Sequence, residues 1–213
     1  MASLLISEIF YSLQGESSRI GLPTVFVRLA GCPLRCRWCD SAYAFAGGQS
    51  IEIQDILAEV RKHQVRQVCV TGGEPLAQPG CLALLTILAD AGYDVSLETS
   101  GALDISEVDG RISRVMDLKA PDSGEEGNNL WGNLQHLNSR DEIKFVIASR
   151  NDYEWVCEVI RKHRLDACCP LLISPVQGLM EPRQLAEWML ADHLPARFQL
   201  QLHKLLWGNM RSK

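Results

Sequence analysis

Three cysteines close together in the sequence provide its clearest chemical signal. Cys32, Cys36 and Cys39 lie in one short loop-like stretch that also holds proline, arginine and tryptophan. Thiolates at these spacings can converge on one metal centre. A structural zinc site normally has four protein ligands, and the nearest downstream candidates, His63 and Cys69, lie in or beside regular elements. A four-iron cluster held by three cysteines, with one iron open to a small molecule, therefore explains the spacing better than zinc does.

The other five cysteines need no such chemistry. They lie in or beside apolar runs, where cysteine is usually a small buried hydrophobe, and they are Cys69, Cys81, Cys157, Cys168 and Cys169. A chain of 213 residues without an evident export signal can build its core without disulfide bonds. A disulfide framework is therefore the weaker interpretation.

Composition and charge restrict the class of protein. With 46% apolar and 22% charged residues, the chain has material for one well-packed domain, so we expect a single domain over residues 1–213. No run of eighteen apolar residues occurs, and no basic stretch followed by an apolar run opens the chain, so we expect a cytoplasmic protein without a membrane partner. A net charge of -5 without basic blocks argues against direct binding of nucleic acid.

The elements that must position the cysteine loop follow a repeated β-then-α pattern. Apolar runs rich in β-formers predict strands at residues 24–30, 67–71, 94–98, 115–118, 143–147 and 170–174, with 198–202 as a possible closing strand. Between them, apolar residues share one helical face, as in 56–60, 155–160 and 185–189. A complete eight-unit barrel takes about 250 residues. The length therefore predicts an α/β fold in which about six βα units form a partial (β/α) barrel of parallel strands, an abbreviated TIM-like barrel.

Polar and glycine-rich segments follow these predicted strands, at the edge where such folds form their sites. They are the cysteine loop and residues 71–75, 98–101, 117–119 and 174–178. Packing alone does not explain polar groups at five strand ends, so we expect them to line one pocket. Residues 122–129 are acidic and contain glycine, which predicts a mobile surface loop.

Two of these segments resemble the motifs of a known superfamily. The pattern Cys32-x-x-x-Cys36-x-x-Cys39, with Trp38 before the last cysteine, resembles the signature of radical S-adenosylmethionine enzymes, and residues 72–75 (GGEP) resemble their methionine-binding motif. The resemblance implies a radical SAM core with a 4Fe-4S cluster, whose open iron binds the amino and carboxylate groups of S-adenosylmethionine. Reductive cleavage of this cofactor would give methionine and a 5'-deoxyadenosyl radical.

Further segments spread over nearly the whole chain carry a closer resemblance. They are residues 8–16 (EIFYSLQGE), 25–28 (VFVR), 39–41 (CDS), 98–101 (ETSG), 141–144 (DEIK) and 203–204 (HK), and they resemble the 7-carboxy-7-deazaguanine synthases. The resemblance implies a carbon-nitrogen lyase of queuosine (tRNA modification) biosynthesis. It would contract the ring of 6-carboxy-5,6,7,8-tetrahydropterin to 7-carboxy-7-deazaguanine and release ammonia. The resemblance also implies regeneration of S-adenosylmethionine, assistance by Mg2+, an electron donor such as flavodoxin, and a homodimer.

The resemblance also assigns site residues. It implies that the pterin contacts Leu13, Gln14, Gly15, Arg28 and Thr71. It implies that S-adenosylmethionine contacts Trp38, Cys39, Asp40, Gly73, Asp117, Leu118, Lys119, Ser174, Pro175, Val176 and Gln177. The hydroxyl of Ser41 would bind Mg2+, which prefers hard oxygen ligands. The guanidinium of Arg28 can grip a carboxylate bidentately, and no side chain is expected to act as a conventional acid or base. Glu98 and His203 are further candidates for the pocket, while the exact roles of Glu98, Lys144 and His203 remain unassigned.

Two alternatives stay open at this point. Asp117 and Leu118 stand where serine and proline often precede the lysine in this family, and an Asp-x-Lys run also occurs in enzymes that activate glycyl-radical proteins. The compact length and residues 13–16 favour a small substrate over a protein loop. The second alternative, a non-catalytic zinc or electron-transfer module, has no use for the GGEP turn or the polar strand ends.

Overall fold

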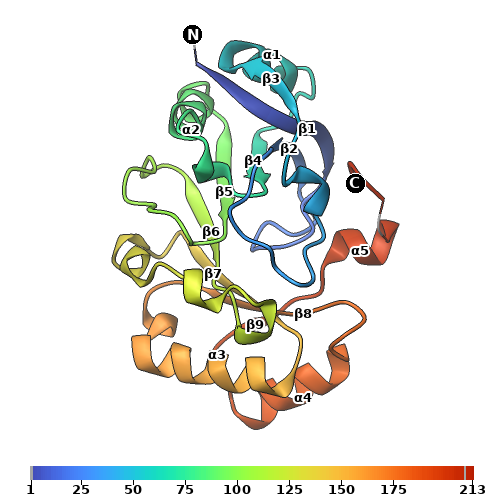
Figure 1. The fold of residues 1–213 in the computed structure, drawn as a ribbon, viewed down its shortest axis with the longest axis vertical. Coiled ribbons are helices and arrows are strands. Elements are labelled where there is room, and N and C mark those ends of the chain that lie inside the picture. Colours follow the sequence, from blue (N-terminus) through green and yellow to red (C-terminus); the bar gives the residue numbers. More distant parts are fainter. Residues whose placement is uncertain (1, 209) are drawn as a thin grey trace.

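The computed structural model describes residues 2–208 and 210–213, which form a curved nine-stranded sheet with the order β3-β1-β2-β4-β5-β6-β7-β8-β9 (Figure 1). The strands are β1 (Ser3–Leu13), β2 (Pro23–Leu29), β3 (Gln49–Glu52), β4 (Gln67–Gly72), β5 (Asp94–Thr99), β6 (Ser113–Asp117), β7 (Glu142–Ile147), β8 (Leu171–Pro175) and β9 (Arg197–Phe198). Strand β2 and strands β4 to β9 run parallel, whereas β1 pairs antiparallel with both β2 and β3. The sheet is thus a partial barrel with an antiparallel edge.

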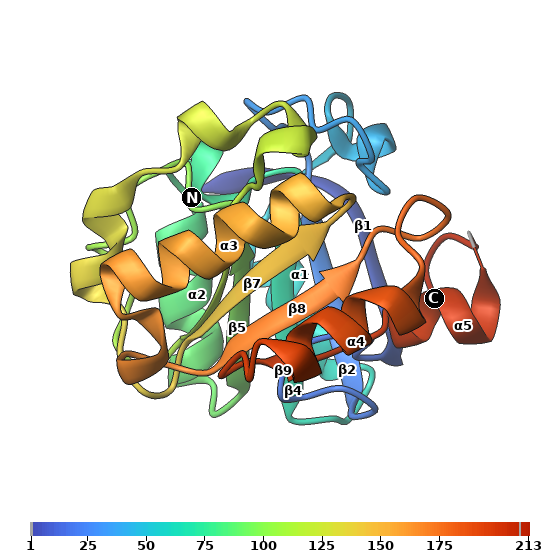
Figure 2. The same ribbon diagram turned by 90° about the horizontal axis from the view of Figure 1, so that it is seen from below.

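Helices cover the outer face of this sheet, as Figures 1 and 2 show. They are α1 (Ile53–Arg61), α2 (Cys81–Asp90), α3 (Arg150–His163) and α4 (Pro182–Ala191), while the short α5 (Leu202–Trp207) follows β9. Helix α1 buries Ile56, Leu57 and Val60, the apolar face that the sequence predicts. Ser149 caps α3, because its hydroxyl accepts a hydrogen bond from the backbone amide of Asp152. Among the described residues, no helix is long and apolar enough to cross a membrane.

The two faces of each parallel strand serve different purposes. In β2, Val25, Val27 and Leu29 pack into the core beneath the helices, while Phe26 and Arg28 face the inside of the curve. The same alternation places Ile143, Phe145 and Ile147 of β7 in the core and its Lys144 inside. Because side chains alternate along a strand, an apolar outer face leaves every second position for polar groups on the inner face.

The six predicted parallel strands are confirmed, and the differences lie at the edges of the sheet. Residues 3–13 and 49–52 add the antiparallel strands β1 and β3, which the sequence pattern does not predict. The closing strand is wrong in extent, since β9 covers only two residues and α5 begins at Leu202. The terminal segment turns there to reach the loop after β1, where the amide of Leu202 donates to the carbonyl of Gly15 at 2.9 Å.

The prediction that an α-helix follows each parallel strand is wrong for the connections after β5 and β6. In the described chain the connection from β5 to β6 contains no helix, and the connection from β6 to β7 contains only short 3-10 helices. The 3-10 helices are η1 (Ala42–Ala44), η2 (Pro75–Ala77), η3 (Pro121–Ser123), η4 (Glu126–Asn128), η5 (Trp131–His136) and η6 (Leu165–Ala167). The segment expected as a surface loop, residues 122–129, lies mostly at the surface, but it is anchored by the buried side chains of Ser123 and Asn129. The amide of Asn129 bonds both the N–H and the carbonyl of Lys119, at 2.8 and 2.9 Å, which holds this segment against the end of β6.

A buried ion pair joins β6 to the start of β7. Asp141 has no exposed surface, and its carboxylate accepts hydrogen bonds from Nε and the Nη2 group of Arg114 at 3.1 and 2.7 Å. The backbone amides of Arg114 and Asn138 also donate to it. Every lone-pair direction of the carboxylate is therefore used.

We predict that Asp141→Ala lowers the free energy of unfolding by about 3 to 5 kcal/mol, because it leaves the buried guanidinium of Arg114 without its partner. Urea denaturation of the anaerobic protein, followed by circular dichroism, measures this change. The matched control is Asp109→Ala, which removes a carboxylate from the exposed Arg111 and should change stability little. Equal effects of the two substitutions would contradict the prediction.

Candidate active site

The carboxyl ends of the parallel strands surround a cavity of about 800 Å³. Its walls come from the cysteine loop after β2, from the ends of β4 to β8, and from the loop after β1. Helix α5 and residues 210–213 complete it on the side of β1. The cavity thus lies where the sequence predicts, at the edge to which the parallel strands point.

Cys32, Cys36 and Cys39 line this cavity and are only half-buried, whereas none of the other five cysteines lines it. Of those five, Cys69, Cys81 and Cys169 are buried, as predicted, and the remaining two are partly exposed. Burial raises the pKa of the Cys32 and Cys36 thiols, and the ammonium of Lys119 partly opposes that rise. Because thiolates are the ligands of iron, cluster binding must release these protons.

The three thiols are not gathered around the position of a single metal ion. No group of three His, Cys, Asp or Glu side chains in the described chain comes close enough together to hold one metal ion. A 4Fe-4S cluster separates its cysteine ligands more widely, since each thiolate binds a different iron. The loop itself is held in place, with the amide of Arg37 bonded to the carbonyl of Ser123 at 3.0 Å and that of Gly31 to Ala44 at 2.8 Å.

The GGEP turn packs directly beneath the cysteine loop. A Cβ atom on Gly73 would lie 2.6 Å from that of Cys32, so only glycine fits there. Glu74 is completely buried, and its carboxylate accepts hydrogen bonds from the hydroxyls of Thr99 and Ser100 and from the amides of Ser100 and Leu76. Glu74 therefore fastens the turn to the end of β5, a role that the sequence motif does not reveal.

Two of the side chains expected to contact the pterin meet around one carboxylate. Glu98 accepts a hydrogen bond from the amide of Gln14 at 3.2 Å and from the hydroxyl of Thr71 at 2.9 Å. Arg28 lies on the neighbouring strand β2, with its Nε 2.7 Å from the carboxylate of Glu8. The structure thus brings together the predicted Gln14, Thr71 and Arg28, and it adds Glu98 as the group that orients two of them.

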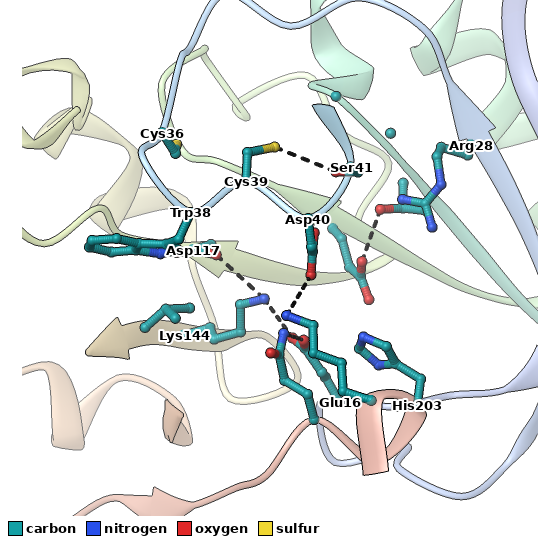
Figure 3. A pocket seen from close by; sticks show the side chains of 18 of the residues that line it. Glu16, Arg28, Cys36, Trp38, Cys39, Asp40, Ser41, Asp117, Lys144 and His203 are labelled. Atoms are coloured by element: carbon teal, nitrogen blue, oxygen red, sulfur yellow. Dashed lines mark hydrogen bonds and ion pairs between the residues drawn. The ribbon is translucent and has the colours of Figure 1, made fainter. Parts of the chain in front are cut away.

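A row of alternating charges crosses the floor of the cavity (Figure 3). The ammonium of Lys144 lies 2.5 Å from Glu16 and 3.4 Å from Asp117, and Asp117 lies 3.1 Å from Lys119. Burial by itself would lower the pKa of both lysines, but the neighbouring carboxylates outweigh it and raise the pKa of each. Burial would likewise raise the pKa of Glu16, and Lys144 holds it below its usual value. Glu16, Lys119 and Lys144 therefore remain ionised near neutral pH.

Helix α5 supplies two further groups to the cavity. Lys204 lies 3.1 Å from the carboxylate of Asp40, and His203 packs against Gly15 so closely that a Cβ there would overlap its ring. Burial lowers the pKa of His203, which makes the neutral imidazole the dominant form at pH 7. The pairing of Asp40 with Lys204 is not visible from sequence, because 164 positions separate the two residues.

Most of the site residues expected from sequence line the cavity. They are Leu13, Gln14, Gly15, Arg28, Cys32, Cys36, Trp38, Cys39, Asp40, Ser41, Thr71, Gly73, Asp117, Leu118, Lys119, Val176 and Gln177. Ser174 and Pro175 do not line it; they are buried at the end of β8. The sequence does not predict the ion pair between Glu16 and Lys144, although both residues lie in segments that carry the family resemblance.

Comparison with known proteins gives the family. The model of the Radical SAM superfamily matches residues 26–168. The chain is 48% identical over 210 residues to the 7-carboxy-7-deazaguanine synthase of Chlorobaculum tepidum, with 97% of this chain and 96% of that protein covered. It is 42% identical over 217 residues to the enzyme of the same name from Koribacter versatilis, covering 95% and 96%. The crystal structure of QueE from Escherichia coli superposes with a TM-score of 0.78 at 25% identity, covering 94% and 95% of the two chains. On this evidence the chain belongs to the 7-carboxy-7-deazaguanine synthases, within the radical SAM superfamily.

Proposed function

We propose that this enzyme contracts the ring of 6-carboxy-5,6,7,8-tetrahydropterin to give 7-carboxy-7-deazaguanine and ammonia, on the route to queuosine. The observation that carries the proposal is the composition of one cavity. It joins three half-buried cysteines to a guanidinium, Arg28, and a carboxylate, Glu98, on the inner faces of β2 and β5, on either side of β4. The first set suits a catalytic cluster, and the second suits a small molecule that carries both a carboxylate and N–H donors.

The proposed substrate matches the second set group by group. Its carboxylate would pair with Arg28, since a guanidinium offers two parallel N–H donors. The N–H groups on the pyrimidine edge of a pterin would donate to Glu98, whose carboxylate Gln14 and Thr71 hold in place. The stacked rings of Phe10 and Phe26, with centroids 4.9 Å apart, give the inner wall an apolar surface for the bicycle.

The residues proposed to bind the cluster and S-adenosylmethionine line another part of the cavity. Cys32, Cys36 and Cys39 would hold the 4Fe-4S cluster. When bound, the cluster and S-adenosylmethionine supply the radical that removes a hydrogen atom from the substrate. Asp117 and Lys119 offer a carboxylate and an ammonium to the polar groups of S-adenosylmethionine, and the bare backbone at Gly73 allows close approach.

Five further residues complete the proposed cofactor contacts. Trp38 and Asp40 would contact the adenine side from the cysteine loop, and Val176 and Gln177 would contact it from the end of β8. Ser174 and Pro175 would act only by fixing the course of that segment, since neither lines the cavity. Ser41 is the proposed Mg2+ ligand, and its hydroxyl lies 3.8 Å from the sulfur of Cys39, beside the expected cluster.

The family membership leaves no support for a zinc or electron-transfer module, and it favours a small-molecule substrate over the protein loop of a glycyl-radical enzyme. We further propose that the protein is a cytoplasmic homodimer, that it acts as a single domain, and that a flavodoxin-like protein reduces its cluster. The homodimer and the reductant rest on the sequence resemblance, and the location and the single domain rest on length and composition.

Product analysis tests the proposed reaction. The anaerobically reconstituted and reduced protein, given Mg2+, S-adenosylmethionine and the carboxylated tetrahydropterin, should release 7-carboxy-7-deazaguanine and ammonia. S-adenosylmethionine should remain almost unconsumed, because it is regenerated in each turnover. Absence of the deazaguanine from protein with a full cluster would refute the reaction, and one methionine formed per product would refute the regeneration.

We predict that Cys36→Ala loses most of its bound iron, because two thiolates cannot retain the cluster that three hold. Iron and sulfide analysis after anaerobic reconstitution measures the loss. The matched control is Cys157→Ala, a partly exposed cysteine of α3 outside the cavity, which should bind iron like the parent protein. Full iron retention by Cys36→Ala would contradict the assignment.

We also predict that Arg28→Ala strongly impairs turnover of the pterin but still binds S-adenosylmethionine. The lost charge-assisted pair should reduce kcat/KM by the equivalent of about 2 to 5 kcal/mol, because the site is partly buried. Arg28→Lys should restore activity only in part, since an ammonium cannot replace the planar fork. Steady-state kinetics and binding of the cofactor separate the two effects. Unchanged kcat/KM in Arg28→Ala would place the substrate carboxylate elsewhere.

A further inference from the structure

A break in the register of β1 turns one glutamate towards Arg28. The pairing between β1 and β2 shifts between Ile6 and Glu8, as in a β-bulge. Before the shift, Leu4 and Ile6 pack into the core beneath the helices. After it, Glu8 stands opposite Arg28, and Phe10 opposite Phe26, on the inner face. A bulge re-aims side chains in this way, and here it places a carboxylate beside a residue of the cavity wall.

Glu8 is the centre of a small network that includes the end of the chain. Its Oε1 accepts hydrogen bonds from Nε of Arg28 at 2.7 Å and from the hydroxyl of Tyr43 at 2.8 Å. Its Oε2 accepts a hydrogen bond from the hydroxyl of Ser212 at 2.9 Å. Burial alone would raise the pKa of Glu8, and these three donors outweigh it and lower that pKa. Glu8 is therefore an ionised acceptor whose two oxygens are both engaged.

The network restricts the orientation of Arg28. The side chains of Arg28 and Glu8 are only 17% and 14% exposed, so solvent screens their attraction weakly. The rings of Phe10 and Tyr43 flank the guanidinium, with its central carbon 5.7 and 5.9 Å from their centroids. Tyr43 is itself covered by the guanidinium of Arg211, at 3.9 Å from the ring centroid. Burial first, and then the bond to Glu8, raise the pKa of Tyr43 to about 12, so it stays a hydrogen-bond donor.

Only one edge of the guanidinium is used by this network. Glu8 engages Nε, and among the described residues none accepts a hydrogen bond from the two terminal nitrogens of Arg28. Arg28 lines the cavity, whereas Glu8 does not. In the rigid planar fork of a guanidinium, fixing Nε also fixes the direction of the terminal N–H groups.

We infer that Glu8 is a positioning residue for substrate recognition, which holds the terminal nitrogens of Arg28 in the orientation that receives the carboxylate of the substrate. Tyr43 and Ser212 hold Glu8 in turn. The inference rests on the proposed function, because it takes Arg28 as the partner of that carboxylate. It makes selectivity for a carboxylated pterin depend on a residue that does not touch the substrate.

The charge of Glu8 and its orienting effect on Arg28 change the affinity for an anionic substrate in opposite directions. A carboxylate beside Arg28 weakens the attraction that an anionic substrate experiences, so removal of charge alone should strengthen binding. Removal of the hydrogen-bond acceptor frees the guanidinium to rotate and should weaken binding. Glu8→Gln removes the charge but keeps an acceptor for Nε, whereas Glu8→Ala removes both. Comparison of the two variants therefore isolates orientation.

The experiment measures the affinity ratio for 6-carboxypterin over pterin, which lacks the carboxylate, by fluorescence titration of the anaerobic holoenzyme with S-adenosylmethionine. Glu8→Ala should lower this ratio at least about tenfold, the equivalent of a lost charge-assisted hydrogen bond. Glu8→Gln should keep the ratio within about threefold of the parent or raise it. Glu158→Ala on the exposed face of α3, outside the cavity, serves as the control and should leave the ratio unchanged.

The outcomes separate this inference from the proposed function. If Arg28→Ala loses the preference for 6-carboxypterin and Glu8→Ala keeps it, the positioning role is overturned while the substrate assignment stands. If Arg28→Ala keeps the preference, the assignment of Arg28 itself fails. Glu8→Ala could lose its cluster or its affinity for S-adenosylmethionine. In that case the Tyr43→Phe variant tests the inference instead, because it removes one hydrogen-bond donor to Glu8. A severalfold lower ratio in Tyr43→Phe supports the inference, and an unchanged ratio overturns it.

Discussion

Several charged side chains around the cavity are largely removed from water and lie beside an opposite charge. Lys144 lies between Glu16 and Asp117, and the Arg28 and Lys204 cations pair with Glu8 and Asp40. A buried ion without a partner is costly enough to change its protonation state or to destabilise the fold. The need for pairing therefore dictates which loops must meet at the cavity. The loop after β1, the cysteine loop and α5 are brought together because each carries one member of a pair.

The sequence predicts those parts of the fold that depend on local pattern. Six strands follow from apolar β-rich runs, and the cysteine loop follows from the spacing of three thiols. Strand β1 escapes prediction because the bulge between Ile6 and Glu8 interrupts its two-residue alternation. The pair of Lys144 and Glu16 escapes because its members are 128 positions apart. Residue types thus reveal which chemistry is available, while the partner that tunes each group depends on the fold.

The partial barrel leaves an opening that the end of the chain covers. The sheet begins with β3 and β1 and ends with β9, and these edges do not pair with each other in the described structure. Helix α5 leaves β9 and returns to the β1 side, where Gln201 donates to Glu16 at 2.6 Å and Ser212 donates to Glu8. In Figure 1 this terminal segment lies beside β1 and β2. A short chain thereby encloses a small substrate without the strands of a complete barrel.

A pair of hydrogen bonds between Gln199 and Ser17 fixes the loop after β1, and it can form only late in folding. The amide side chain of Gln199 bonds both the N–H and the carbonyl of Ser17 at 2.8 Å, across a separation of 182 positions. Contacts of such high sequence separation form late, because closing a long loop costs entropy before any contact compensates for it. During synthesis the first strands emerge from the ribosome long before Gln199 does. The mouth of the cavity is therefore completed only after Gln199 has emerged, so the cysteine loop stays accessible from solvent until then.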